Sequence, residues 1–176
     1  MADNYLEKRM ADYQAGRTSG PAPRPASRPA PGRARLPYPH RNVLVTGADT
    51  PCGRAVVAQF VAAGCSVAFT AADPAAGTDL ARSAGGRYFP MTAPEALERL
   101  RAEGRDTDVA VVCDGQPVPA PRVIVVTDDA DFGDADPPGA IVLLADNPLA
   151  AAWQCLTLAH RDIKPAAKFF DIRTEQ

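Results

Sequence analysis

Long hydrophobic runs, closely spaced cysteines and a strong excess of one charge are all missing from this sequence of 176 residues. No window approaches the ~20 apolar residues of a transmembrane helix. The N-terminus carries acids and has no continuous apolar stretch, unlike a secretory signal. We therefore expect a cytoplasmic protein. The formal net charge of −2 is too close to neutral to favour nucleic acid or a membrane surface as a partner.

The four cysteines lack the spacing that metal sites and disulfide frameworks use. Cys52, Cys65, Cys113 and Cys155 lie far apart in the chain, which is typical of buried, reduced thiols. The aspartates within residues 128–136 lack the glycine and the closing glutamate of an EF-hand loop in register. We therefore expect solvated loop acids there, and no metal site.

The first 40 residues differ from the rest. Residues 1–15 form an amphipathic arm in which Leu6, Met10 and Tyr13 fall on one helical face. A helix this short must dock on something to persist. Residues 16–40 contain seven prolines, which predict an extended, polyproline-like linker.

Charge is unevenly distributed along the chain. Residues 14–41 contain six arginines and no acid, whereas residues 106–136 contain eight aspartates and one arginine. The simpler interpretation is a solvated basic tail and solvated acidic loops. The alternative is self-association, in which the tail of one copy lies on the acidic edge of another.

Residues 41–176 have the pattern of a single α/β domain. Residues 42–46 form a continuous apolar run, typical of a strand buried on both faces. A glycine-containing loop, a helix over residues 54–63, a stop at Gly64 and a second strand over residues 66–70 follow. This succession predicts a right-handed βαβ unit.

The later elements keep the alternation of strand and helix and then lose it. In chain order we predict a helix over 78–84, a strand over 87–90, a helix capped by Thr92 and Glu95 that runs to Glu103, strands over 109–113, 122–127 and 140–144, a helix capped by Asn147, and a strand over 168–172. In the last helix we expect these side chains to face inward: Leu149, Trp153, Leu156 and Ile163.

Only a short proline-rich loop joins the strands at 109–113 and 122–127, whereas a parallel crossover usually needs about a dozen residues or more. Either the strand at 122–127 pairs antiparallel, or the loop makes a tight, non-helical crossing. The predicted fold class is a three-layer α/β Rossmann-like domain with a mostly parallel sheet. An antiparallel strand in its C-terminal part is one of the two alternatives.

The segment VLVTGADTPCGRA, residues 43–55, resembles the TGxxxGxG nucleotide-binding segment of short-chain dehydrogenases/reductases. The likeness runs to about Gly115 and so covers about half of the chain. In such a loop, glycines let the backbone approach a pyrophosphate at a helix N-terminus. Here Pro51 replaces the middle glycine and brings no N–H, and Asp49 adds a negative charge.

The resemblance implies NAD or NADP as the cofactor, without distinguishing them. The cofactor-binding residues that it implies are Thr46, Gly47, Asp49, Thr50, Pro51, Cys52, Gly53, Asp73 and Gly115. The alternative for Gly47 and Gly53 is that they only permit tight packing of strand against helix. Asp73 lies one or two positions after the place of the family's ribose-binding acid, and capping a helix is its alternative role.

The catalytic set of that family is absent. It uses a serine and a tyrosine followed four residues later by a lysine; none of the four tyrosines has that lysine, and no serine follows Ser83. The nearest imitation is His160 with Lys164, with Thr127 as a partner for a carbonyl. A histidine at a helix C-terminus also suits the helix dipole. The family's long helix after the fourth strand has no counterpart.

We therefore expect a noncatalytic relative of these enzymes, a pseudoenzyme that binds a nucleotide or serves as a structural module in an oligomer. Its arm, residues 1–15, would mediate self-association or pairing with a related dehydrogenase. The alternative is an NAD(P)-dependent oxidoreductase with a rearranged active site that uses His160. A third hypothesis is redox sensing through Cys52, which lies at a helix N-terminus.

Overall fold

The computed structural model describes residues 40–116, 118–128, 139–161 and 169–173. The predicted arm over residues 1–15 and nearly all of the predicted linker lie outside them. The described residues all belong to one unit of the chain, residues 35–176. Within them, no helix is long and apolar enough to cross a membrane.

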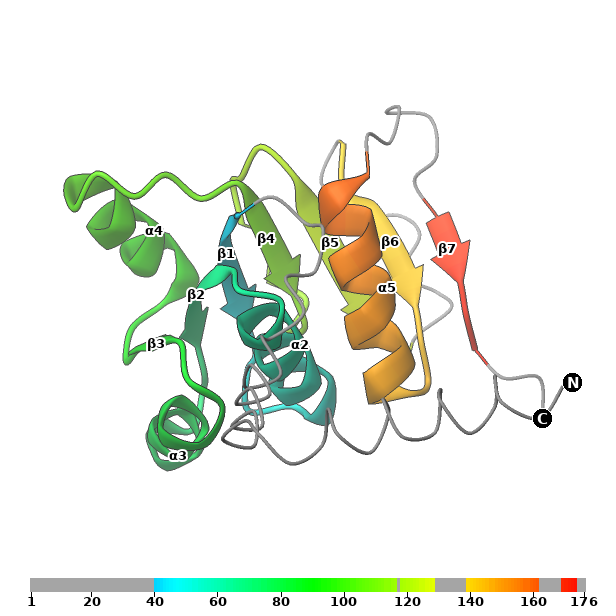
Figure 1. The fold of residues 1–176 in the computed structure, drawn as a ribbon, viewed down its shortest axis with the longest axis horizontal. Helices are drawn as coiled ribbons and strands as arrows, with labels where there is room; N and C mark the ends of the chain where they lie inside the picture. The colour runs from blue at the N-terminus through cyan, green and yellow to red at the C-terminus, as the bar shows by residue number, and fades with distance from the viewer. Residues whose placement is uncertain (1–39, 117, 129–138, 162–168, 174–176) are drawn as a thin grey trace, which may run out of the picture. The chain divides into compact units, whose positions relative to one another are not determined.

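Seven strands of the described chain form one sheet in the order β3-β2-β1-β4-β5-β6-β7 (Figure 1). Their bounds are β1 (Asn42–Thr46), β2 (Ser66–Thr70), β3 (Arg87–Phe89), β4 (Val109–Val112), β5 (Val123–Thr127), β6 (Ile141–Leu144) and β7 (Phe169–Asp171). Each of the six strand pairs is parallel. The predicted Rossmann-like fold is confirmed, and the antiparallel alternative for β5 is wrong.

The crossing from β4 to β5 is short, and its described residues, 113–116 and 118–122, form no helix. Val118 is buried and Ala120 is half-buried in the cluster that covers one face of the sheet. An extended chain advances about 3.3 Å per residue, so ten residues suffice to retrace a four-residue strand. The Ala110 N–H then bonds to the Arg122 carbonyl (2.8 Å) and starts the parallel ladder.

The helices begin where capping residues and prolines allow. They are α2 (Pro51–Ala62), α3 (Pro74–Ala84), α4 (Ala93–Ala102) and α5 (Pro148–His160). Two starts were predicted too late, at residues 54 and 78. Pro51 and Pro74 occupy first-turn positions, where a missing N–H costs nothing, and Thr50 and Asp73 cap them from the preceding position.

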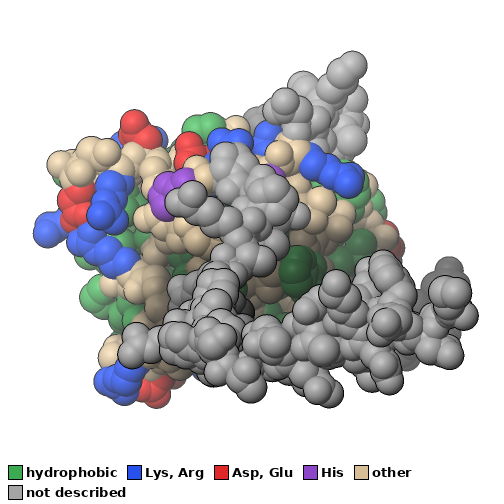
Figure 2. Space-filling view, in the orientation of Figure 1, with side chains coloured by type: hydrophobic (Ala, Val, Ile, Leu, Met, Phe, Trp, Pro, Cys, Tyr) green, Lys and Arg blue, Asp and Glu red, His purple; other side chains and the backbone are tan. Residues whose placement is uncertain are grey.

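Helices cover both faces of the sheet, which makes three layers. On one face, α2 and α5 pack against each other in front of the strands in Figure 1, and Phe60 and Leu156 are fully buried in that layer. On the other face, Leu97 and Leu100 of α4 belong to the same buried cluster as Leu44 of β1. Charged side chains gather over the α3 and α4 end of the molecule (Figure 2).

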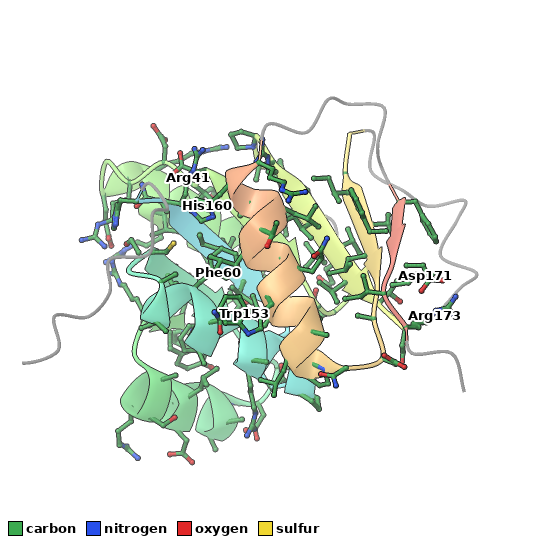
Figure 3. All side chains as sticks on the ribbon, turned by 45° about the vertical axis from the view of Figure 1, so that its right-hand side comes forward. Arg41, Phe60, Trp153, His160, Asp171 and Arg173 are labelled. Carbon is green, nitrogen blue, oxygen red and sulfur yellow. The ribbon has the colours of Figure 1, made fainter. Side chains whose placement is uncertain are left out.

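The orientation of α5 differs from the prediction. Leu149 and Trp153 are 69% and 53% exposed, Leu156 is buried as predicted, and Ile163 lies outside the described residues. The buried face consists of Ala151, Ala152, Cys155, Leu156, Leu158 and Ala159. The four small side chains on this face let the helix approach α2 and the sheet closely, whereas the large ring of Trp153, labelled in Figure 3, stays half-exposed.

Candidate functional site

Hydrogen bonds of Thr50 fix the conformation of the loop between β1 and α2. The Thr50 hydroxyl donates to the Gly47 carbonyl (2.8 Å) and accepts the N–H of Gly53 (3.0 Å), while the Thr50 N–H also donates to Gly47 (3.0 Å). The Ala48 N–H bonds to the Thr70 carbonyl at the end of β2 (3.0 Å). These contacts place the first turn of α2 at the carboxyl edge of the sheet.

The two glycines of this loop are required by its own packing. A Cβ on Gly53 would lie 2.2 Å from the Gly47 carbonyl oxygen and 2.8 Å from the Ala48 Cα. Gly47 has φ +65°, and a Cβ there would lie 2.9 Å from the Cβ of Asp114. Close packing of strand, loop and helix therefore explains both residues, whether or not a ligand binds.

Few donors remain at the N-terminus of α2 for an anion. Pro51 has no N–H, and Thr50 already binds the N–H of Gly53. The N–H of Cys52 is left as the first-turn donor, since the first amides of a helix lack partners within it. Asp49 and Asp114 bring carboxylates to the same edge. The residues present would hold a pyrophosphate weakly.

Asp114 is a site residue that sequence reasoning did not identify. Its carboxylate accepts the Thr46 hydroxyl (2.6 Å) and the N–H of Gln116 (3.2 Å), so it joins the end of β1 to the turn after β4. The available signal was its position directly after the fourth strand. Because the end of β4 adjoins the glycine loop in this strand order, a polar residue there faces the loop.

An open groove of about 950 Å³ runs along the carboxyl ends of β2, β3 and β4. Its lining consists of Thr70, Ala71, Ala72, Pro74, Tyr88, Pro90, Met91, Thr92, Ala93, Glu95, Glu98, Arg99, Ala102, Asp114 and Gln116. The hydroxyl oxygen of Tyr88 is buried and has no hydrogen-bond partner among the described residues. The groove therefore offers apolar walls and several acids to a ligand.

Two of the predicted cofactor residues have local structural roles. The Asp73 carboxylate accepts the N–H of Ala75 (2.9 Å) and so caps α3, which was its alternative role. Gly115 has φ +72° and takes the chain out of β4. Their contacts with a cofactor stay predictions.

Two partly buried cysteines, Cys52 and Cys113, lie in the first turn of α2 and directly after β4. The hydrogen bond from the Cys113 thiol lowers the pKa of Cys52, although burial opposes this shift. The same contact, together with burial, raises the pKa of Cys113 well above its usual value. Burial raises the pKa of the Cys155 thiol well above its ordinary value. All four cysteines are free, and only Cys155 is fully buried.

The catalytic candidates lie at opposite ends of the strands of the sheet. Thr127 ends β5 at the carboxyl edge, whereas α5 runs back from β6 and brings His160 to the amino edge. Figure 3 shows His160 at the same end of the molecule as Arg41, which precedes β1. The His160 ring donates from Nδ1 to the Leu156 carbonyl (2.8 Å). Lys164 lies outside the described residues.

Within the described residues, no group of three or more His, Cys, Asp or Glu side chains could hold a metal ion. Of the aspartates predicted to be solvated loop acids, only Asp128 lies within the described residues, and it is exposed.

No protein-family model matches this sequence, and no curated protein matches it. Solved structures do match. BdcA in complex with NADPH is 15% identical, with a TM-score of 0.53 over 77% of this chain and 94% of that one. An apo SCOR enzyme from Clostridium thermocellum is 14% identical, with a TM-score of 0.57 over 76% and 91%.

A metagenomic short-chain oxidoreductase in complex with NADP is also 14% identical, with a TM-score of 0.52 over 77% of this chain and 98% of that one. At these identities the likeness shows the fold alone. The chain has the fold of short-chain dehydrogenases/reductases, as the resemblance of residues 43–55 predicted.

Proposed function

We propose that this protein is a noncatalytic member of the short-chain dehydrogenase fold that binds an NAD(P)-type dinucleotide weakly. One observation carries the proposal: the open groove lies at the carboxyl edge of the sheet, and two of its lining residues, Thr70 and Asp114, bond to Ala48 of the glycine loop and to Thr46 directly before it. Open parallel sheets bind their ligands at this edge, beside the point where the strand order reverses. BdcA and the metagenomic oxidoreductase, which share the fold, hold NADPH and NADP.

The charges of the groove favour NADH over NADPH. Glu95, Glu98 and Asp114 line it, and Asp73 caps the adjoining helix. Arg99 also lines it but pairs with Glu103 (3.2 Å between Nε and Oε1). An additional phosphate on the ribose would meet carboxylates and no unpaired cation among the groove residues, so we expect NADPH to bind no more tightly than NADH.

Two features support the noncatalytic half of the proposal. None of the four tyrosines is followed by a lysine four residues later. His160, the nearest substitute for the tyrosine, lies at the edge of the sheet opposite the glycine loop. Steady oxidation of NADH with carbonyl compounds, catalysed by the pure protein, would overturn this half and leave the binding site in place.

The binding half is tested by titrating the full chain with NADH and NADPH and following the fluorescence of the bound cofactor. We expect saturation only at high cofactor concentrations. Pro51→Gly restores a first-turn N–H, and Asp49→Asn removes a charge, so each should tighten binding by about 0.5–1 kcal/mol, or about threefold, as expected for one contact with an anion at a helix N-terminus.

Asp106→Asn is the matched control. It removes the same charge from an exposed residue that precedes β4, at the amino edge of the sheet. It should leave cofactor affinity unchanged. Absence of saturable binding in the parent and in both loop variants would contradict the proposal and leave a purely structural module.

The predicted assembly role is a second part of the proposal. The arm over residues 1–15, which lies outside the described residues, would mediate self-association, and the exposed Leu149 and Trp153 offer an apolar surface to a second copy. Sedimentation of the full chain tests this. Leu6→Asp combined with Met10→Asp should lower the sedimenting mass of an oligomer, and an unchanged mass would contradict the role.

A further inference from the structure

The groove at the carboxyl ends of β2, β3 and β4 carries a negative charge. Glu95 and Glu98 of α4 and Asp114 after β4 line it, and all three are exposed. No ion pair among the described residues involves any of these carboxylates. Arg99 also lines the groove, but it pairs with Glu103, which does not. The charge of the three acids therefore remains available to a cationic ligand.

Apolar side chains line the same groove. Met91 is 37% exposed, Pro74 and Pro90 are exposed, and Tyr88 is half-buried. Apolar and aromatic walls suit an extended, proline-rich segment, which has no internal hydrogen bonds and loses little conformational freedom when it binds. Acids beside such walls select a segment that also carries basic side chains, because each carboxylate attracts a cation and repels an anion.

Residues 17–39, which lie outside the described residues, have the complementary composition. They contain seven prolines, five arginines and no acid, and the prolines predict a polyproline-like conformation. Arg24 and Arg28 are four residues apart, or about 12 Å in that conformation. Glu98 follows β3 and Asp114 follows β4, and the three strand spacings between β3 and β4 amount to about 14 Å. One extended segment can thus present an arginine to each of these acids.

We propose that the groove binds the arginine- and proline-rich segment, residues 17–39, of a second copy of this chain. The arginines pair with the carboxylates, and the proline rings pack on the apolar walls. The source is a second copy because the arm that precedes the segment is proposed to mediate self-association, so the inference rests on that part of the proposed function. It does not rest on cofactor binding, although NADH and the segment would compete for one groove.

Sedimentation of the full chain over a range of protein and salt concentrations tests the inference. Arg24→Glu combined with Arg28→Glu, and separately Glu98→Arg, should each weaken association by about five- to tenfold, the effect of one or two surface ion pairs. Added salt should also weaken it, because salt screens exposed charges. The matched control is Arg101→Glu combined with Arg105→Glu, which reverses two exposed arginines that precede β4 and should leave association unchanged.

Mixing the two altered chains provides a second measurement. The chain with Glu98→Arg and the chain with Arg24→Glu and Arg28→Glu should associate with each other more tightly than either does with itself, because each segment then meets a groove of opposite charge. A full chain that sediments as a monomer, or a mixture that shows no recovery, would overturn the inference.

The failure of this inference is distinguishable from the failure of the proposed function. Association that Leu6→Asp with Met10→Asp abolishes, and that the charge reversals leave intact, would overturn the groove as the binding site and leave the role of the arm in place. Titration with NADH tests the nucleotide function separately, and its result does not change the expected sedimentation of the variants.

Discussion

The two halves of the sheet connect their strands differently. From β1 to β4, every crossing contains a helix that begins at a capping residue: Thr50 for α2, Asp73 for α3 and Thr92 for α4. From β4 to β5 the crossing contains no helix, and α5 is the only helix described after it. The strands are nevertheless parallel throughout.

Neighbouring strands can therefore be parallel without a helix in the crossing that joins them. In the second half, the order depends on strands that are buried from end to end, such as β4 and β6. It also depends on Arg122, whose Nη1 donates to the carbonyls of Leu158 (3.0 Å), Ala159 (2.9 Å) and Arg161 (2.8 Å). One side chain thus joins the start of β5 to the C-terminus of α5.

The largest expected difference between the halves concerns their aromatic residues. Phe60 of α2 is fully buried, so Phe60→Ala should cost about 3–5 kcal/mol of unfolding free energy. Trp153 of α5 is 53% exposed, so Trp153→Ala should cost about 0.5 kcal/mol or less. Urea unfolding followed by circular dichroism measures both. Equal losses would mean that the helices anchor the two halves alike.

The glycine loop should be the next most sensitive place. Gly53→Ala puts a Cβ against backbone atoms that cannot move aside, and we expect a loss of about 3 kcal/mol, the upper part of the usual overpacking range. Gly64→Ala is the control, because nothing lies within 4 Å of its added Cβ. Its φ of +84° should cost about 1–2 kcal/mol. Thermal unfolding of both variants compares their losses of stability. A larger loss for Gly64→Ala than for Gly53→Ala would contradict the conclusion that close packing requires Gly53.

Arg122→Ala should weaken the second half specifically. It removes a charged donor from three carbonyls at a helix C-terminus, and we expect a loss of about 2 kcal/mol. Hydrogen exchange should speed up in β5 and α5 more than in β1 and β2. Arg82→Ala removes an exposed arginine from its pair with Asp79 and should cost about 0.5 kcal/mol or less. If Arg122→Ala changed exchange rates equally in all four elements, Arg122 would not specifically join β5 to α5.

Two carboxylates in surface ion pairs, Glu103 and Asp171, give the smallest effects. Hydrogen bonds from Arg87 and then Arg99 lower the pKa of Glu103 to about 2, and those from Arg173 lower the pKa of Asp171 to about 2. Each carboxylate therefore contributes to stability above its ordinary pKa, and the contribution is lost as the pH falls toward about 2.

Carboxyl titration by NMR separates the two pairs. Arg87→Gln should raise the pKa of Glu103 only in part, because Arg99 also bonds to it (3.2 Å). Arg173→Gln should raise the pKa of Asp171 and change stability least, because this pair spans two positions of one strand end and can persist in the unfolded chain. A larger loss of acid stability for Arg173→Gln than for Arg87→Gln would contradict this ranking.

Much of the first half was predictable because its signals are local. The apolar runs of β1 and β2 matched the observed strands. Glu95 accepts the N–H of Thr92 (2.9 Å), which is the reach-back contact of the predicted capping box, and also accepts the Thr92 hydroxyl (2.8 Å). The starts of α2 and α3 were missed because Pro51 and Pro74 were assigned to loops. Both prolines are in fact suited to a first helical turn.

The site was predictable only where its residues are neighbours in the chain. Gly47, Thr50 and Gly53 meet within one loop, and the pattern of residues 43–55 identified them. The bond of Asp114 to Thr46 joins segments that lie on either side of two intervening strands in the chain. No local sequence pattern indicates which residue after β4 lies next to the loop between β1 and α2.

By itself, the sequence determined the βαβ beginning, the loop that closes on its own glycines, and the absence of the tyrosine–lysine pair, because each depends on residues a few positions apart. Only the tertiary structure decided that β5 lies parallel, that Trp153 is half-exposed, that His160 lies at the opposite end of the strands from the loop and that Asp114 bonds to Thr46. These outcomes depend on packing between distant segments: close approach of α2 and α5 favours small side chains at their contact, and the parallel order brings the ends of β1 and β4 together.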